Sequence, residues 1–411
     1  MENFSFKGWV AGFLFVSLLW ASPGMAQQKE PLRIGMETTL SGPYAQPGTD
    51  NLNGAILYLE QKGYTIAGRK VEFYPEDEEA NPNVALTKAK RLVELRKIHI
   101  FAGPFMANDA YAVAPYFDSK KVPMIVDSTP DDLTQRKRSK WVIRSAQTSS
   151  QAAHVMADYA YRVLGYRKAT SVGPDYAFGW ENAGGFQKVF EDAGGQVLQK
   201  IWFPFNVNDF SPYIAQISDD ANTVFAMLGG KQAMVLLKQH MEYGLKEKVP
   251  IIGVMQITDE SILPTMGDEA LGVITAGIYS AALDTPVNRD FVRKYKARFG
   301  KLPSAFSEFS YNFMEMIDVA MTSLKGDISD PEKILNALKA ARYEAPRGPM
   351  RIDAYGNPTQ NIYIRKCERV QGEFQNTVIY TYPEVSQFWK YSPEEFLKQP
   401  VYSRDYPPLK R

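Results

Sequence analysis

The residues that could carry catalytic or metal chemistry are few and scattered. His99, His154 and His240 lie far apart in the sequence and share no metal-ligand spacing. The chain has no G-x-S-x-G nucleophile elbow, no G-x-G-x-x-G cofactor fingerprint and no phosphate-binding P-loop. Its single cysteine, Cys367, lies in the alternating stretch IYIRKCERV, which predicts a strand residue without chemistry. No catalytic residue, no cofactor and no metal ion are therefore expected, and an internal disulfide is excluded.

Charge adds little to this picture. The 411 residues carry a formal net charge of +1, which gives no argument for a nucleic-acid partner or an anionic membrane. The acidic run EDEE, Glu76 to Glu79, could supply paired carboxylates or metal ligands. A solvated loop explains the same run more simply, and we expect a solvated loop here.

The elements around these residues alternate between strand and helix. Short apolar runs such as LRIGMET, IHIFAGP and VPMIVDS predict strands, and amphipathic segments such as VALTKAKRLVELRK predict helices. Asn81 before Pro82 and Asp330 before Pro331 are typical of helix starts. This alternation predicts an α/β fold with parallel sheets covered by helices on both faces, and the chain length predicts two domains.

In an open parallel sheet, ligands collect outside the carboxyl ends of the strands, where helices begin with free N–H groups. The segments that directly follow predicted strands are therefore the candidate site. They are residues 38–48, 103–108, 127–130, 146–150, 174–180, 228–231 and 255–258. The first of them contains the loop LSGPYAQPG, which is too long for a tight connection and is expected to form one lip of a binding cleft.

The first residues have the features of a secretory signal peptide. Lys7 precedes an apolar run from Trp9 to Trp20, and a Pro–Gly break and small residues follow. This pattern predicts cleavage after Ala26 and a periplasmic protein, because the apolar run is too short for an ordinary membrane span. Residues 383–411, rich in Pro and aromatic residues, are expected to wrap the surface.

Several stretches together resemble one family. They are RIGMETTLSGPYAQPG, NGAILYLEQKG, AGPFMANDAYAVAPYFDSKKVPMIVDSTPDDLT and DYAFGWENAGGFQKVFEDAGGQVL. With them the chain, over roughly residues 32–382, resembles the type I periplasmic solute-binding proteins of ABC importers, specifically the Leu/Ile/Val-binding family.

The resemblance implies two doubly wound lobes joined by three crossovers, with ligand in the cleft between them. It places residues 31–147 and 278–348 in the first lobe, and residues 149–276 and 349–382 in the second. It also implies a monomer that binds a small molecule, closes about a hinge and docks transiently on a membrane permease. Neither an enzyme nor a nucleic-acid-binding protein is implied.

Departures from the family pattern bear on the ligand. Family members that bind branched amino acids hold the ligand carboxylate with hydroxyl residues and its ammonium with acids. Here the resemblance matches Ser128 and Thr129 to the hydroxyl positions, whereas Ser149 and Met255 stand where the acids are expected. Burying an ammonium group without a partner would cost on the order of several kcal/mol, as for any unpaired buried charge. The matched positions therefore favour an apolar or aromatic carboxylate.

The full set of expected ligand-binding residues combines these matches with the strand ends. It consists of Ser41, Pro47, Phe105, Ala107, Asn108, Ser128, Thr129, Ser149, Phe178, Gly229, Met255 and Tyr279. Thr129, which precedes Pro130, is also expected to cap a helix.

Two other classes of protein stay open at the level of sequence. The same fold can serve as a ligand-sensing module for a signalling receptor. A periplasmic α/β hydrolase or oxidoreductase is the other alternative, and the missing nucleophile elbow and cofactor fingerprint argue against it.

Overall fold

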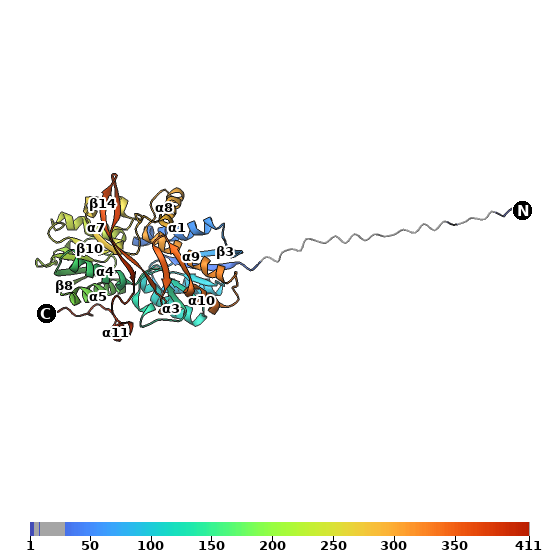
Figure 1. Cartoon of the computed structure of the whole chain (residues 1–411), viewed down its shortest axis with the longest axis horizontal. Helices are drawn as coiled ribbons and strands as arrows, with labels where there is room; N and C mark the ends of the chain where they lie inside the picture. The colour runs from blue at the N-terminus through green and yellow to red at the C-terminus, as the bar shows by residue number, and fades with distance from the viewer. Residues whose placement is uncertain (4–7, 9–28, 411) are drawn as a thin grey trace. The chain divides into compact units, whose positions relative to one another are not determined.

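The computed structural model describes residues 1–3, 8 and 29–410, and the cleavage site predicted after Ala26 lies outside them. The described residues from 31 to 410 belong to one compact unit. Within that unit the strands form two sheets, each with its own helices (Figure 1). None of the helices that the structure describes combines the length and the apolar character needed to cross a bilayer.

The first sheet has six strands in the order β2-β3-β1-β4-β5-β6. Its strands are β1 (Leu32–Thr38), β2 (Thr65–Ile66), β3 (Arg69–Asp77), β4 (Ile100–Ala102), β5 (Met124–Val126) and β6 (Val142–Arg144). All neighbours are parallel except β2 and β3. Strands β4, β5 and β6 are buried at every residue, as expected for a parallel sheet with both faces covered.

The second sheet follows the order β12-β13-β14-β11-β10-β9-β7-β8, with β15 paired to β14. Its strands are β7 (Lys168–Pro174), β8 (Gln196–Phe203), β9 (Thr223–Ala226), β10 (Ile251–Val254), β11 (Ile274–Gly277), β12 (Arg342–Ala345), β13 (Gly348–Ile352), β14 (Pro358–Val370) and β15 (Glu373–Val385). Strands β7 to β11 pair in parallel, and β12 to β15 add antiparallel pairs. The predicted α/β class with parallel-dominated sheets is confirmed.

Helices fill the connections between strands. They are α1 (Ala45–Gln61), α2 (Pro82–Glu94), α3 (Ala107–Lys120), α4 (Ser149–Arg162), α5 (Ala177–Asp192), α6 (Ser211–Ile214), α7 (Gly230–Glu242), α8 (Pro286–Phe299), α9 (Ala305–Ser323), α10 (Pro331–Ala340) and α11 (Pro393–Lys398). The predicted caps are confirmed at two of them: Asn81 accepts from the Asn83 N–H at 3.0 Å, and Asp330 accepts from the Glu332 N–H at 2.8 Å.

The helices divide between the sheets. Helix α1 packs against α9 and α8, beside the first sheet, whereas α4 packs against α5, β10 and β11 of the second. The chain therefore passes between two lobes three times, after β6, after β11 and after α10. We call the first sheet with α1–α3 and α8–α10 the first lobe, and the second sheet with α4–α7 the second lobe. The residue boundaries given above for the lobes stay a prediction.

The expected loop over Leu40 to Gly48 is largely helical. A short 3-10 turn, η1 (Gly42–Tyr44), leads directly into α1, so that Pro47 lies in the first helical turn. A proline is accepted there because first-turn N–H groups have no acceptor within the helix. Gly48 is required by close packing, since a Cβ at this position would lie 1.7 Å from the Thr39 carbonyl oxygen.

The last residues cross from one lobe to the other. Arg136 of the first lobe donates to the carbonyl oxygens of Phe396 and Gln399, both at 2.9 Å. Farther along, Gln187 in α5 donates to the Pro408 carbonyl at 2.9 Å. The tail also carries a small aromatic core in which Phe388, Phe396 and Tyr402 are buried. It therefore contacts both lobes.

Candidate functional site

One cavity lies between the lobes, at the carboxyl ends of strands from both sheets. Its walls consist of Tyr44, Phe105, Met106, Ala107, Asp127, Ser128, Thr129, Phe306 and Phe309 from the first lobe, and Tyr176, Phe178, Gly229 and Gln256 from the second. They surround about 520 Å³ of space free of protein atoms, including open solvent at the mouth.

Six of the thirteen residues that line the cavity are aromatic. Phe105 and Phe306 have ring centroids 5.0 Å apart, and Phe306 and Phe309 are 5.9 Å apart. On the other lobe Tyr176 stacks on Phe178 at 6.2 Å. Such walls favour a flat apolar ligand, because aromatic pairs add to the gain from burying area.

Three helices begin at the cavity. Helix α3 starts directly after Met106, α5 directly after Tyr176 and α7 directly after Gly229. None of these three N-cap residues makes a side-chain capping hydrogen bond. The first N–H groups of each helix therefore stay available, and they carry the positive end of the helix dipole. Among the described residues that line the cavity there is no Lys, Arg or His. An anionic group in this cavity would be held by backbone N–H groups and hydroxyls.

Glu78 fixes the loop that carries Phe105 and Met106. Its carboxylate accepts from both of their N–H groups at 2.9 Å and from the Thr39 hydroxyl at 2.7 Å. The side chain is fully buried. The expectation of a solvated acidic loop at Glu76 to Glu79 is thus wrong at Glu78, because the nearby loop turns its N–H groups toward this carboxylate. It is also wrong at Glu76 and Asp77, which are the last residues of β3.

The hydroxyl pair at the end of β5 is held from behind by Arg144. This buried guanidinium donates to the carbonyl oxygens of Ser128 and Pro130. Ser149 donates its hydroxyl to Thr129 Oγ1 at 2.9 Å, whereas Ser128 Oγ has no partner in the described part of the chain. Thr129 does not cap the next turn, Asp131–Thr134, whose N-cap position is Pro130. The predicted cap is absent because the Thr129 hydroxyl contacts α4 instead.

Half of the residues expected from sequence lie on the cavity wall. Those are Phe105, Ala107, Ser128, Thr129, Phe178 and Gly229. The other six lie elsewhere. Ser41 is exposed, Pro47 is buried inside α1, Asn108 lies beside neighbouring hollows, Ser149 sits behind Thr129, and Met255 and Tyr279 are held by Arg365. That the residues of either group bind ligand stays a prediction.

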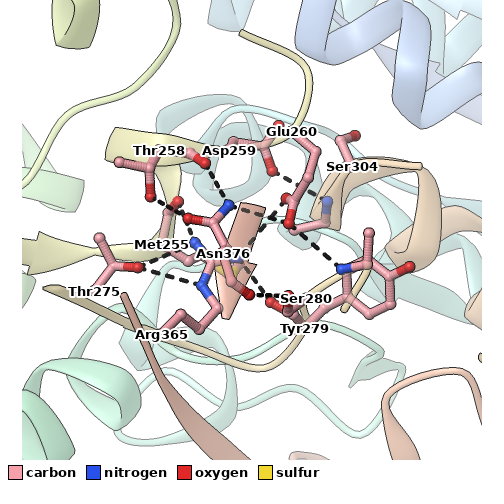
Figure 2. Close-up of polar contacts among 12 residues, drawn as sticks. Met255, Thr258, Asp259, Glu260, Thr275, Tyr279, Ser280, Ser304, Arg365 and Asn376 are labelled. Carbon is pink, nitrogen blue, oxygen red and sulfur yellow. Dashed lines mark hydrogen bonds and ion pairs between the residues drawn. The ribbon is translucent and has the colours of Figure 1, made fainter. Parts of the chain in front are cut away.

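Met255 and Tyr279 belong to a buried polar cluster behind the wall (Figure 2). Arg365 Nη2 donates to the Met255 carbonyl at 2.7 Å, and Nη1 donates to the Tyr279 carbonyl at 2.8 Å. Asn376 joins this cluster by donating to the Thr258 carbonyl at 2.6 Å. The cluster fixes the turn η3 (Met255–Thr258), and the residue of that turn that lines the cavity is Gln256.

Sequence reasoning did not place several wall residues in the site. They are Tyr44, Met106, Asp127, Tyr176, Gln256, Phe306 and Phe309. Tyr44, Met106, Asp127, Tyr176 and Gln256 lie in or next to strand-end segments, so that signal was present for them. Phe306 and Phe309 belong to α9, and only the return of the chain to the first lobe brings them to the cavity.

Asp127 is the acid on the wall among the described residues. Its Oδ2 accepts from Asn51 Nδ2 at 2.5 Å, and its Oδ1 has no partner. Burial raises the pKa of Asp127 to about 7, although Asn51 and Arg347 oppose the shift. The carboxyl is therefore only partly ionised near neutral pH.

The cavity lies between two lobes and is lined by aromatic rings and by the uncapped N-termini of three helices. These features define a solute-binding protein. A model of the periplasmic binding protein family matches residues 31–372, and the chain belongs to this family. A Leu/Ile/Val-binding protein homolog 6 from Brucella melitensis is 32% identical over 370 residues, covering 87% of this chain and 93% of that protein.

Solved structures give the same result. An ABC transporter substrate-binding protein from Sphaerobacter thermophilus is 35% identical with a TM-score of 0.83, covering 87% of this chain and 99% of that one. A solute-binding protein of an ABC transporter from Rhodopseudomonas palustris, in complex with 3,4-dihydroxybenzoic acid, is 31% identical with a TM-score of 0.83, covering 87% and 98%. The family consists of non-enzymatic binding proteins, so the hydrolase and oxidoreductase alternatives are removed. Its members act outside the cytoplasm.

Proposed function

We propose that this chain is the solute-binding component of an ABC importer and that it captures an aromatic carboxylate between its lobes. The observation that carries the proposal is the composition of the cavity wall. Aromatic rings from both lobes face a space that also receives the uncapped starts of α3, α5 and α7. A flat ring with one anionic group matches both features.

The binding mode follows from the wall. The ring lies among Phe105, Phe178 and Phe306, where burial of apolar area contributes roughly 25 cal/mol per Å². The carboxylate accepts from the free Ser128 hydroxyl and from the first N–H groups of α3. Because the ligand touches both lobes, it stabilises the closed arrangement over the open one.

A free amino acid fits this cavity less well. Its ammonium would need a full counter-charge, and the acid on the wall is Asp127, whose pKa burial raises to about 7. The relative from Rhodopseudomonas palustris supports the proposal, because its structure holds an aromatic acid in the same fold.

Transport completes the proposal. The chain is exported with cleavage after Ala26, acts as a periplasmic monomer and presents its closed form to a membrane permease. The signal-peptide pattern and the family of binding proteins support this part. Closure would allow the permease to distinguish the ligand-bound protein from the empty protein.

Calorimetric titration of the mature protein with benzoate, 4-hydroxybenzoate and leucine tests the ligand class. We expect at least one of the two aromatic acids to bind with micromolar or tighter affinity, on the order of −8 kcal/mol. Leucine should produce no measurable heat, because its ammonium lacks a fully ionised partner. Binding of leucine alone would refute the proposed ligand class and leave the family unaffected.

A further inference from the structure

Three buried polar atoms of the cavity wall have no hydrogen-bond partner among the residues that the structure describes. They are Asp127 Oδ1, Ser128 Oγ and Gln256 Oε1. Buried polar atoms are normally satisfied, so these atoms mark hydrogen bonds that a ligand can supply. Ser128 Oγ can donate to the ligand carboxylate, which leaves two oxygen acceptors to be explained.

Gln256 is held firmly by its neighbours. The carbonyl before it, on Met255, accepts from Arg365, and the Thr258 hydroxyl donates to Asn376 Oδ1 at 2.8 Å (Figure 2). A Cβ placed on Gly229 would come within 2.9 Å of the Gln256 Cβ, so glycine at that position makes room for this side chain. Gln256 is 7% exposed. Its buried amide oxygen has no donor among the described residues and is an acceptor in the wall contributed by the second lobe.

Asp127 supplies the second acceptor from the first lobe. Asn51 on α1 donates a hydrogen bond to its Oδ2. Glu308 on α9 raises the pKa of Asp127, and Arg347, which directly precedes β13, lowers it. Asn51 also donates to the Phe306 carbonyl at 3.1 Å, which ties this carboxyl to the aromatic wall. Oδ1 is buried and has no donor among the described residues, and Asp127 is a residue of the cavity wall.

We propose that Asp127 and Gln256 recognise a hydroxyl group on the ligand ring, so that the preferred ligand is a hydroxylated aromatic acid. This inference rests on the proposed function, because it assigns the second polar group of the same ligand. An unsubstituted ring would leave both acceptors buried and unpaired. A site built to accept from a ligand hydroxyl discriminates strongly against the analogue that lacks it.

A hydroxyl fits the two acceptors better than a charged donor does. One acceptor is a neutral amide, and the other, Asp127 Oδ1, accepts a hydrogen bond in the ionised form of the carboxyl. A phenolic O–H is a neutral donor and needs no compensating full charge. An ammonium substituent would need one.

Wild-type protein alone gives the first test, through calorimetric titration with four ligands: benzoate, 4-methylbenzoate, 3-hydroxybenzoate and 4-hydroxybenzoate. The methyl group matches a hydroxyl in size and donates nothing. We expect at least one hydroxybenzoate to bind on the order of 10- to 100-fold more tightly than both benzoate and 4-methylbenzoate. Equal affinities within about threefold would overturn the inference while leaving aromatic-acid binding intact. Absence of binding for all four would refute the proposed function, and the inference with it.

The variant Gln256→Met gives the second test, because methionine keeps the length and removes the acceptor. The hydroxybenzoate-to-benzoate affinity ratio should collapse to about threefold or less, whereas Gln256→Glu, which retains acceptors, should keep the preference. Gln375→Met makes the same substitution on β15 away from the cavity and should leave the wild-type ratio. A full ratio in Gln256→Met, with a wild-type melting temperature, would overturn the role of this residue. If Gln256→Met does not fold, the wild-type ligand series decides.

Discussion

The hydroxyl groups at and behind the cavity wall differ in whether they are free to form a hydrogen bond with a ligand. The Ser149 hydroxyl is already committed, because it donates to Thr129 Oγ1 and lies near the Thr129 carbonyl at 2.9 Å. Ser128 Oγ is free and buried. Two neighbouring residues of the same type thus have different roles: one stiffens the wall, and the other is available for the ligand.

Phe178 should contribute to ligand affinity without supporting the fold. It is only half-buried and stacks on Tyr176 at the cavity. Replacement by Ala removes ring contacts with the ligand, and we expect aromatic-acid affinity to fall about tenfold or more. Titration of Phe178→Ala measures this effect. Phe374→Ala, which removes a partly buried ring of β15 outside the cavity, serves as control and should bind like wild type. Unchanged affinity in Phe178→Ala would remove this ring from the binding surface.

Sequence pattern predicted which segments form the site better than which side chains face it. The rule that ligands bind at strand ends selected residues 255–258. In the structure Gln256 lines the cavity, whereas Met255 does not and its carbonyl is bonded to Arg365. The deciding contact is a hydrogen bond from Arg365, which lies 110 residues farther along the chain. No local pattern encodes such a contact, because it depends on how β14 pairs beside β11.

At the scale of elements, the caps and apolar runs determined most helices and strands. Asn81 with Pro82 and Asp330 with Pro331 start α2 and α10, as local hydrogen bonding requires. The exception was the lip after β1, where Pro and Gly predicted an irregular loop and α1 formed instead. Tertiary packing decided this case, since Gly48 lets the helix start approach Thr39.

Helix α4 and the carboxyl-terminal tail form a contact that should be sensitive to acid. His154 on α4 is fully buried, lies 3.4 Å from the Tyr402 hydroxyl and meets the rings of Tyr391 and Phe396 edge-on. Burial lowers the pKa of His154 from 6.5 to about 3, and Lys188 adds to the shift.

The sign of the pH effect follows from the two pKa values. Between about pH 6.5 and pH 3 the unfolded chain binds a proton at His154 and the folded chain does not. The free energy of unfolding should therefore fall with decreasing pH, by up to about 1.4 kcal/mol per pH unit from this group. In His154→Gln that dependence should be absent. Urea unfolding at several values between about pH 4 and pH 7 compares the two slopes, and parallel curves would contradict the assignment.

The two lobes contact each other beside the cavity, and the ring of Tyr44 makes one of these contacts. Tyr44 of the first lobe stacks on Phe205 of the second with centroids 5.7 Å apart. Directly beside it, a Cβ on Gly230 would lie 3.2 Å from the Pro43 carbonyl oxygen. These contacts stabilise the closed state before any ligand is bound.

Tyr44→Ala should shift the ligand-free protein toward an open form. We expect a larger radius of gyration in solution scattering, and aromatic-acid affinity lowered in proportion to the loss of closed molecules. Saturating ligand should restore the compact form, because it bridges both lobes. The exposed Tyr243, at the end of α7, provides the matched control in Tyr243→Ala. An unchanged radius in the ligand-free variant would show that other contacts hold the lobes together.

The crossing tail has a practical consequence for building a biosensor. Arg404 pairs with Asp175 at 3.1 Å, and Asp175 immediately precedes Tyr176 on the cavity wall. Because the same tail is tied to Arg136 on the opposite lobe, any opening must strain or release one of its two anchor points. A fluorophore attached near residue 404 would therefore report occupancy through its changing surroundings, with no dye placed inside the cavity.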